Sequence, residues 1–253
     1  MPHVIIMGSG TSNGVPTLGV TYPPEFLANP KNHRTRSSIL IQGSEGNLLV
    51  DCPPELRLQV TGLGVTRIDA VVITHAHADH IMGMDDLRSI CMQTKRPVTV
   101  YTLPQHMEDI RRIFSYAFMD FPPEIIVPRF DLRQMPDELD IVGLTIRSFI
   151  VDHGKTKVIG LRVNDLAYIT DVSSIPEQAE EALQGLDTLI LDAVRYAPHP
   201  NHFNMEGAIA AAKKIGAKKT YFTHLSDDYD HDKVNAELPH GMELAYDGLQ
   251  IAI

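Results

Sequence analysis

The chain has 253 residues, 43% of them hydrophobic, which suffices for one large domain or two small ones with a sizeable core. Its formal net charge of -10 argues against broad, non-specific binding to nucleic acid or to an anionic membrane, and no apolar run reaches the roughly 18 residues that span a bilayer. Two cysteines, Cys52 and Cys91, are too few for a disulfide framework and predict buried, reduced thiols in a cytoplasmic protein.

The first half of the chain alternates short strand-like and helix-like runs, beginning with a strand rather than a signal peptide. Strands are predicted at residues 4–7, 38–42, 47–51, 68–73 and 98–101, and a short helix at 53–63. Thr102 is expected to be the N-cap of a second helix, in which Met107, Ile110, Phe114 and Phe118 follow at helical spacing. This apolar stripe predicts a helix face that packs into the core or forms a dimer contact. Residues 102–139 are the most irregular segment and are expected to overhang a cleft.

The second half continues the alternation, without a repeat or a linker. Strands are predicted at residues 143–151, 157–163, 166–170, 188–192, 219–223 and 249–253. Helices are predicted at 205–215 and at 176–183, where Ser174 and Glu177 have the spacing of a capping box. The pattern predicts one α/β domain over residues 1–253.

Metal-ligand side chains follow several of these predicted strands. Asp51, His75, Asp171, Asp192 and His224 each come at the end of a hydrophobic run. Loops at one edge of a sheet gather into a site in layered α/β folds, so we expect these side chains to meet.

The densest ligand cluster is Thr74-His75-Ala76-His77-Ala78-Asp79-His80. It places three imidazoles and a carboxylate together after a predicted strand, and this donor set suits a divalent metal ion, or two. His75 and His77 point the same way on an extended loop, whereas Asp79 and His80 begin the next helix and can turn toward a second ion. We therefore predict one ion on His75, His77 and His153, a second ion on Asp79, His80 and His224, and Asp171 as a bridge between them.

Two ions in such a site would generate a bridging hydroxide as the nucleophile near neutral pH and would clamp an anionic substrate. Asp79 is also expected to orient that nucleophile. The ligand types suit zinc, manganese or iron. The acidic net charge does not exclude a phosphate substrate, because the two ions would reverse the local sign.

The ordered set His75-x-His77-x-Asp79-His80, His153, Asp171 and His224 resembles the metallo-β-lactamase-fold hydrolases over nearly the whole chain. The resemblance implies a four-layer αββα sandwich with a dinuclear site at the sheet edge, and a buried Asp51 that supports the ligand loop. Further motifs resemble the branch that includes the phosphodiesterase of the carbon–phosphorus lyase pathway, which opens phosphoribosyl 1,2-cyclic phosphate, and more distantly ribonuclease Z. These motifs lie at residues 8–16, 34–38, 201–204, 223–226, 238–239 and 246–248.

Two departures from that branch bear on substrate and metal content. The phosphodiesterase carries a cysteine-rich insert that binds a structural zinc, whereas residues 20–34 contain no cysteine, so no such zinc is expected. Asp227 stands three residues after His224, where many members of the branch have histidine. The outer substrate pocket is therefore expected to differ.

His202 corresponds to a histidine that faces the metals in the resembling enzymes, which implies either a proton donor to the leaving alkoxide or a group that stabilises the phosphorane charge. The alternative is a surface loop histidine. Two interpretations of Arg34 and Arg36 stay open. They contact a second phosphate or a sugar of the substrate, or they are a simple pair of surface charges. The glycines of residues 8–14 lack the P-loop pattern and are expected to let backbone approach the metal site.

These observations predict a dinuclear metal-dependent hydrolase, foremost a phosphodiesterase acting on a cyclic phosphate or nucleotide-like phosphodiester. A ribonuclease Z-like processing enzyme and a non-catalytic metal-binding accessory protein are the alternatives. Other chemistries of the superfamily, such as thioester or lactone hydrolysis, also stay open, because the metal ligands alone do not distinguish them. The expected partner is a small phosphate ester, with no membrane, no general nucleic-acid binding and a possible homodimer.

Overall fold

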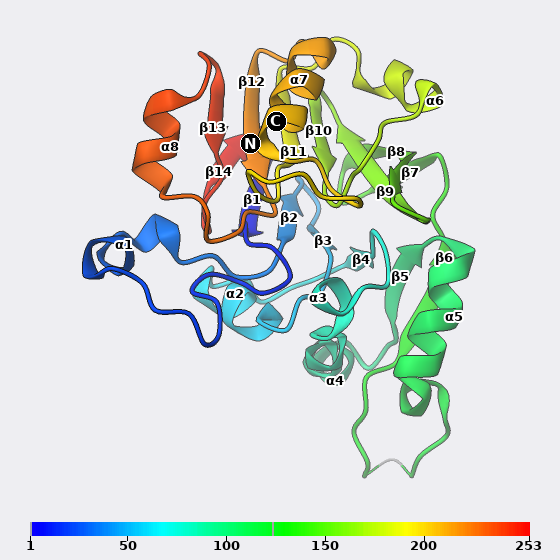
Figure 1. The fold of residues 1–253 in the computed structure, drawn as a ribbon. Coiled ribbons are helices and arrows are strands. Elements are labelled where there is room, and N and C mark those ends of the chain that lie inside the picture. Colours follow the sequence, from blue (N-terminus) through cyan, green and yellow to red (C-terminus); the bar gives the residue numbers. More distant parts are fainter. Residues whose placement is uncertain (1, 123) are drawn as a thin grey trace.

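Two seven-stranded β-sheets lie face to face between helices in the computed structural model, which describes residues 2–122 and 124–253 (Figure 1). The strands of the first sheet, in spatial order, are β14 (Gln250–Ala252), β1 (His3–Gly8), β2 (Ser38–Gln42), β3 (Asn47–Val50), β4 (Ala70–Val72), β5 (Val98–Thr102) and β6 (Phe130–Gln134). Those of the second are β13 (Met242–Leu244), β12 (Lys219–Thr223), β11 (Thr188–Asp192), β10 (Leu166–Ile169), β9 (Thr156–Val163), β8 (Leu144–His153) and β7 (Glu138–Ile141).

Each sheet is antiparallel on one side and parallel on the other. In the first sheet, β14, β1, β2 and β3 pair antiparallel, and β3 through β6 pair parallel. In the second sheet, β7 through β10 pair antiparallel, and β10 through β13 pair parallel. The carboxyl ends of parallel strands reach one sheet edge, which is where a layered α/β protein builds its site.

Helices cover the outer face of each sheet (Figure 1). On the first sheet lie α2 (Leu56–Gly62), α3 (Ala78–Ile81), α4 (Arg88–Thr94) and α5 (Pro104–Ile113), with the short helices η2 (Met84–Leu87) and η3 (Ser115–Phe118). On the second lie α6 (Glu177–Glu180), η4 (Glu181–Leu183), α7 (Met205–Ile215) and α8 (His231–Glu237). None of the helices in the described part of the chain is long and apolar enough to cross a membrane.

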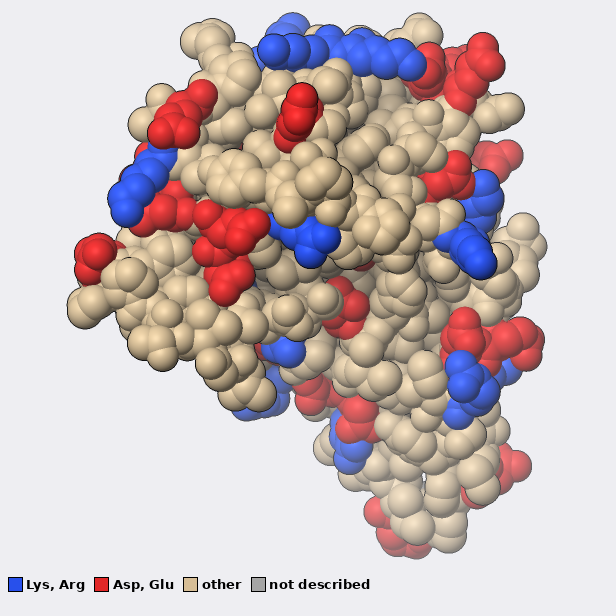
Figure 2. Space-filling view, viewed as in Figure 1, with Lys and Arg blue, Asp and Glu red and all other residues tan. Residues whose placement is uncertain are grey.

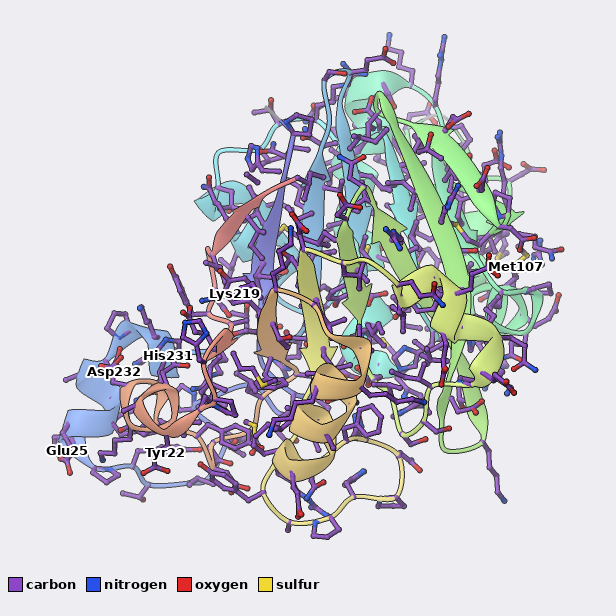
Figure 3. The ribbon with its side chains drawn as sticks, turned by 90° about the horizontal axis from the view of Figure 1, so that it is seen from above. Tyr22, Glu25, Met107, Lys219, His231 and Asp232 are labelled. Carbon is purple, nitrogen blue, oxygen red and sulfur yellow. The ribbon has the colours of Figure 1, made fainter. Side chains whose placement is uncertain are left out.

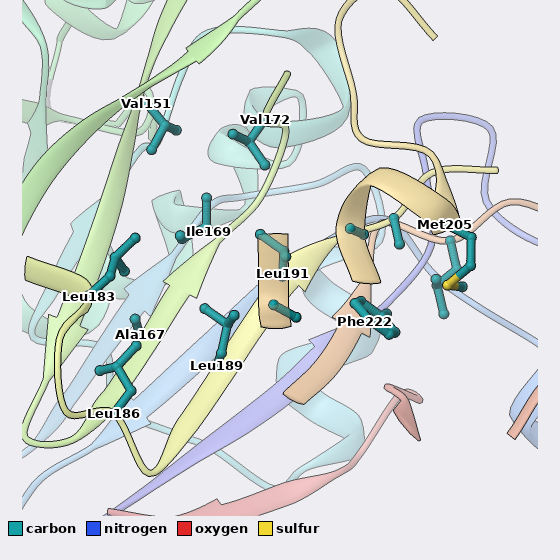
Figure 4. Close-up of a cluster of buried hydrophobic side chains, with 14 of the residues drawn as sticks. Val151, Ala167, Ile169, Val172, Leu183, Leu186, Leu189, Leu191, Met205 and Phe222 are labelled. Carbon is teal, nitrogen blue, oxygen red and sulfur yellow. The ribbon is translucent and has the colours of Figure 1, made fainter. Parts of the chain in front are cut away.

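Three buried apolar layers hold this arrangement together. One lies between the sheets and includes Ile6 and Ile190, which are both 0% exposed. A second packs the first sheet against its helices, and a third packs β11 and β12 against α7 and η4 (Figure 4). The alternation of helix, sheet, sheet and helix layers is the αββα sandwich, so the predicted fold class is confirmed.

Residues 20–34 form an arm that packs against α8. The arm contains α1 (Pro24–Ala28) and η1 (Pro30–Asn32), and Figure 3 shows Tyr22 and Glu25 on the same side as His231 and Asp232. The buried Asn32 side chain donates to the Phe26 carbonyl and accepts from the His231 backbone N–H. His231 is 2% exposed within α8, so it is part of the contact between the arm and this helix.

Two predicted helix caps are wrong. Thr102 is the last residue of β5, where its hydroxyl donates to the Ile73 carbonyl at 2.8 Å, and the N-cap of α5 is Leu103. Ser174 donates to the Asp152 carboxylate at 3.0 Å instead of capping α6. A threonine or serine hydroxyl donates to whichever acceptor the tertiary fold brings within reach. The spacing of residues in a capping motif therefore does not decide its partner.

The irregular segment 102–139 contains more structure than its sequence indicates, because β6 and the start of β7 lie within it. In the apolar stripe of this segment, Ile110 and Phe114 are buried in the core, whereas Phe118 is 37% exposed. Cys52 and Cys91 are free and buried, as predicted.

Candidate metal centre

The histidine-rich loop follows β4 directly and runs into α3. His75 lies three residues after the strand end and is fully buried, and His77 is the N-cap of α3. Asp79 and His80 occupy the first turn of that helix. The loop therefore presents its four ligand-type side chains at the carboxyl edge of the first sheet.

The second sheet supplies the remaining ligand-type side chains. His153 ends β8, Asp171 lies two residues after β10, and His224 directly follows β12. Asp171 and His224 both adopt left-handed backbone conformations, with φ of 51° and 58°. Such conformations are costly for residues other than glycine and concentrate at functional sites.

The seven predicted ligand residues converge into two groups. One group is His75, His77, His153 and Asp171, and the other is Asp79, His80, Asp171 and His224; within each group the candidate ligand atoms all lie within 4.8 Å of one another. Asp171 belongs to both. This grouping matches the division of ligands that the sequence predicts.

The Asp171 carboxylate faces the two groups with different oxygens. Its Oδ1 lies 3.3 Å from Nε2 of His80 and 3.1 Å from Nδ1 of His224. Its Oδ2 lies 3.6 Å from Nε2 of His75 and 4.0 Å from Nε2 of His153. Burial opposes its ionisation, yet His224, His80 and His75 hold the pKa of Asp171 well below its ordinary value. An ionised carboxylate with one oxygen toward each group has the geometry of a bridge.

Asp51 orients His80 from beneath the site. This carboxylate is fully buried with φ of 64°, accepts the backbone N–H of Thr74 at 2.8 Å, and lies 2.8 Å from Nδ1 of His80. Because Nδ1 donates to Asp51, the other ring nitrogen of His80 turns its lone pair toward the centre. Asp51 is thus the buried carboxylate that the sequence places beneath the ligand loop.

The surroundings of His80 fit a bound cation. Its Nε2 is buried without a hydrogen-bond partner among the described residues, and lies 3.3 Å from Oδ1 of Asp171 and 3.4 Å from Oδ2 of Asp79. A lone pair that faces two carboxylates is repulsive unless a positive charge lies between them. Although burial opposes a positive charge, Asp171, Asp79 and Asp51 raise the pKa of His80 well above its ordinary value. The donor set therefore fits a divalent metal ion.

The other histidines are oriented in the same manner. His153 donates from Nδ1 to the Asn201 carbonyl at 2.7 Å, which directs its Nε2 toward Asp171. Nε2 of His75 lies 2.9 Å from Nδ1 of His77. Burial is the first cause that lowers the pKa of His75, His77 and His153, so these rings are neutral and keep a lone pair for a metal.

His202 borders the centre and is not a surface loop residue. Its side chain is 11% exposed, its ring stacks 4.8 Å from that of His224, and its Nε2 lies 4.0 Å from Oδ2 of Asp171. Its Nδ1 donates to Asp192 at 2.8 Å. Burial lowers the pKa of His202, but the hydrogen bond and charge of Asp192 outweigh burial and raise it. Asp192, which ends β11, therefore orients His202 and favours its protonated form.

His199 is a neighbour of the centre that sequence reasoning passed over. Its ring lies 4.8 Å from that of His202, and its Nδ1 accepts the backbone N–H of Asn201 at 3.2 Å. The flanking Pro198 and Pro200 restrict the backbone here. The spacing of His199 resembles no ligand pattern, so no local signal separated it from a surface histidine.

Neither arginine of residues 34–38 offers a free guanidinium to a substrate. Arg34 is 1% exposed and donates to the carbonyls of Ser226 and Tyr229, and burial is the main cause that lowers its pKa to about 10. Arg36 pairs with Glu55. Both arginines therefore bind other parts of the protein.

The glycine-rich first loop packs closely against the arginine segment, and its backbone also pairs with Leu225, the residue that directly follows His224. A Cβ on Gly8 would lie 1.9 Å from the carbonyl oxygen of Arg36, and one on Gly10 would lie 2.8 Å from that of Arg34. Asp247 fixes the same loop, since it accepts from the backbone and hydroxyl groups of Ser9 and Thr35.

Asp227 is engaged by the N-terminal arm. The Tyr22 hydroxyl donates to its carboxylate, and the Thr17 backbone N–H donates to the same tyrosine oxygen at 2.9 Å. This contact links the loop after His224 to the arm, and it engages the Asp227 carboxylate in a hydrogen bond within the protein.

Comparison with known proteins identifies relatives over the whole chain. The model of the beta-lactamase superfamily domain matches residues 46–225. The chain is 32% identical over 254 residues to a protein of Porphyromonas gingivalis (strain ATCC BAA-308 / W83) named octanoyltransferase; the match covers 98% of this chain and 51% of that protein, so the chain spans about half of this relative. A ribonuclease Z of Mycobacterium sp. (strain KMS) is 25% identical over 226 residues, which cover 77% of this chain and 79% of that protein.

Solved structures are also similar to this protein over nearly the whole chain. The crystal structure of a diphosphatase from the PhnP family is similar with a TM-score of 0.92 and 35% identity, covering 100% of this chain and 98% of that one. Zinc-bound PqqB from Methylobacterium extorquens is similar with a TM-score of 0.80 and 22% identity, covering 99% and 100% of the two chains. At that identity the second likeness shows the fold alone.

Proposed function

The chain belongs to the beta-lactamase superfamily, here in its metal-dependent hydrolase form, and we propose that it is a dinuclear phosphodiesterase acting on a cyclic phosphate or a small, nucleotide-like phosphodiester. The observation that carries the proposal is Asp171, which belongs to both ligand groups and faces them with separate oxygens.

The residues would hold two ions in the arrangement their geometry favours. His75, His77 and His153 hold the first ion, Asp79, His80 and His224 hold the second, and Asp171 lies between them. Divalent ions in such a site supply Lewis-acid charge to a phosphoryl group and lower the pKa of water. Nitrogen and oxygen donors without sulfur suit zinc or manganese, with iron as a third option.

Two residues of the chain have roles in proton transfer. Asp79 is ionised, because His80 lowers its pKa to about 2 despite burial, so it can accept a hydrogen bond from the attacking water. His202 is held by Asp192, which raises its pKa, and it donates its Nε2 proton to the leaving oxygen as the ester bond breaks. The two groups approach the substrate from different elements, α3 and the loop before α7.

The names of the relatives favour phosphate chemistry. The relative with a TM-score of 0.92 is called a diphosphatase, and several relatives in sequence are called ribonuclease Z. The octanoyltransferase is about twice as long as the region that this chain matches, so its name carries no argument for acyl transfer here.

The charge distribution favours a small substrate over precursor tRNA. The net charge is -10, and acidic and basic side chains are interspersed over the face shown in Figure 2, without a continuous basic surface. The convergence of all seven ligand-type residues also favours an enzyme over a non-catalytic accessory protein.

The first test is hydrolysis of bis(p-nitrophenyl) phosphate by protein reconstituted with zinc or manganese. We expect turnover by the unaltered chain and a loss of at least about a hundredfold in His77→Ala, because one ion loses a ligand. The matched control is His33→Ala, since His33 lies on the arm, where its ring bonds the Leu27 carbonyl. Equal rates in the unaltered chain and His77→Ala would contradict the proposal. Cleavage of precursor tRNA at a comparable efficiency would favour the ribonuclease.

A further inference from the structure

Three segments that have no role in the proposed function meet around His224. They are residues 8–14, which form the first loop, residues 34–38 and residues 246–248. Gly10 forms isolated bridges to both Arg36 and Leu225, so the first loop lies between residues 34–38 and the segment that follows His224. Segments that are far apart in the sequence therefore border one candidate ligand, which is itself only 1% exposed.

The backbone of His224 is held in a conformation that is unfavourable by itself. Its φ of 58° lies in the left-handed region, which persists at residues other than glycine only where the surroundings enforce it. The next residue, Leu225, is fixed by two bonds. Its N–H donates to the Ser9 carbonyl at 2.8 Å, and its carbonyl accepts the Thr11 N–H at 3.0 Å. The two neighbours of Gly10 thus stabilise the turn that places His224.

Ser37 contacts the His224 ring directly. Its side chain is buried, and its hydroxyl donates to the Gly10 carbonyl at 3.0 Å and lies 3.2 Å from Nδ1 of His224. Because a carbonyl can only accept, the single hydroxyl proton points toward Gly10, and the serine oxygen presents a lone pair to Nδ1. Ser37 therefore joins the first loop to the imidazole.

The surroundings of Nδ1 decide the tautomer of His224. A second acceptor, Oδ1 of Asp171, lies 3.1 Å from the same nitrogen. Two acceptors that face one ring nitrogen favour the tautomer in which that nitrogen carries the hydrogen. The other nitrogen, Nε2, then keeps its lone pair for a cation, as in His80 and His153, whose Nδ1 atoms also face acceptors.

Close packing fixes Ser37 relative to the first loop. Gly10 has no room for a side chain, because a Cβ there would lie 2.9 Å from the Thr35 carbonyl oxygen. The Asp247 carboxylate accepts the backbone N–H of Ser9 at 2.9 Å and that of Thr35 at 2.8 Å, so it joins the loop to residues 34–38. The Ser37 hydroxyl is therefore held at a set position beside the ring.

This support reaches one of the two ligand groups. His224 belongs to the group that contains Asp79. Among the described residues, neither Ser37 nor the first loop makes a hydrogen bond with the three histidines of the other group. Any effect of Ser37 on metal binding should therefore fall on one ion of the two.

We propose that Ser37 is a positioning residue of the candidate centre: together with the first loop it fixes the tautomer and the orientation of His224, and it thereby sets the affinity of the second ion site. The inference rests on the dinuclear centre of the proposed function. It also gives the first loop a role, which is to hold Ser37 and the segment after His224 in place.

The test is calorimetric titration of metal-free protein with manganese. The unaltered chain is expected to show two sites. In Ser37→Ala, the affinity of one site should fall by about tenfold or more, as for other groups that orient a ligand histidine, and that of the other site should stay within about twofold. His77→Ala removes a ligand of the other group, so it should weaken the site that Ser37→Ala spares.

Ser148→Ala is the matched control. The half-buried Ser148 also donates its hydroxyl to a carbonyl, that of Pro136 at 2.8 Å, but it lies in β8 away from the loop, so its loss should leave both affinities unchanged. Turnover of bis(p-nitrophenyl) phosphate separates positioning from general damage. Ser37→Ala should need about tenfold more manganese for half-maximal rate, yet its kcat at saturating manganese should approach that of the unaltered chain.

The outcomes separate the role of Ser37 from the function. Unchanged manganese affinities in Ser37→Ala, or an equal loss at both sites, would overturn the inference. If the unaltered chain hydrolyses phosphodiesters while Ser37→Ala binds both ions normally, the positioning role fails and the phosphodiesterase stands. If no phosphodiester is hydrolysed while one site depends on Ser37 as expected, the phosphodiesterase fails and the positioning role stands.

Discussion

At the scale of single residues, the centre depends on pairs in which a carboxylate or carbonyl orients a histidine. Asp51 directs His80, Asp192 directs His202, and the Asn201 carbonyl directs His153. Each pair fixes which ring nitrogen carries the proton, and therefore which nitrogen faces the centre. Orientation of the ligands is thus built into the protein.

The role of His202 leads to a prediction about leaving groups. Replacing His202 with Ala should reduce kcat by about a hundredfold or more for an alkyl ester, whose oxygen needs a proton on departure. The loss should be much smaller for bis(p-nitrophenyl) phosphate, because p-nitrophenolate is stable without one. A plot of rate against leaving-group pKa should become steeper in the variant. Parallel plots for the variant and the unaltered chain would contradict the role of proton donor.

At the scale of elements, short polar contacts decide where the loops beside the candidate centre lie. The loop that carries His199 and His202 runs directly into α7, and Asn204 caps that helix by accepting the Gly207 backbone N–H at 3.1 Å. The same Asn204 side chain donates to the Tyr196 carbonyl at 3.0 Å. One residue therefore both begins the helix and ties down the loop before it.

Asn204→Ala should lower the free energy of unfolding by about 1 kcal/mol, with a range of about 0.5–2 kcal/mol, because the helix loses its capping acceptor. Chemical denaturation measures the change. Lys213→Ala, an exposed substitution on the same helix, is the control and should change stability by less than about 0.5 kcal/mol. A loss in the control as large as that in Asn204→Ala would show that the cap is not the cause.

At the scale of the whole molecule, the centre joins the two sheets. His75, His77, Asp79 and His80 follow the first sheet, whereas His153, Asp171 and His224 come from the second. Ions held between them would link both halves of the sandwich. Metal binding should therefore stabilise the fold as a whole.

Thermal unfolding tests this expectation without reference to activity. Zinc or manganese added to protein freed of metal should raise the Tm, and at a free ion concentration about a hundred times the Kd the gain should be about 2.7 kcal/mol. His77→Ala should show a clearly smaller rise. No rise in the unaltered chain would argue that the two groups do not bind these ions.

Other whole-molecule expectations from the sequence stay predictions: one domain over residues 1–253, a cytoplasmic location and a homodimer. So does the lack of a structural zinc. In the cysteine-free stretch, Asn32 and its bonds to Phe26 and His231 hold the arm in place.

The sequence by itself determined the fold class and most strands, and it predicted how the candidate ligand residues group together. The bounds of β2, β11, β12 and α7 agree with their hydrophobic patterns, because β2 and β11 are nearly continuous buried runs and α7 buries residues at helical spacing. The candidate ligands could be predicted from the sequence because His75 to His80 form a dense local cluster, and because Asp171 and His224 follow hydrophobic strands.

Only the tertiary structure decided the partners of the polar residues around the centre. Thr102 donates to the Ile73 carbonyl instead of capping a helix, Ser174 donates to Asp152, and the buried Arg34 donates to backbone carbonyls. Nothing in their local sequence distinguishes these outcomes. A hydrogen-bonding or charged side chain takes the partner that folding brings within about 3 Å, and that partner comes from a segment far along the chain.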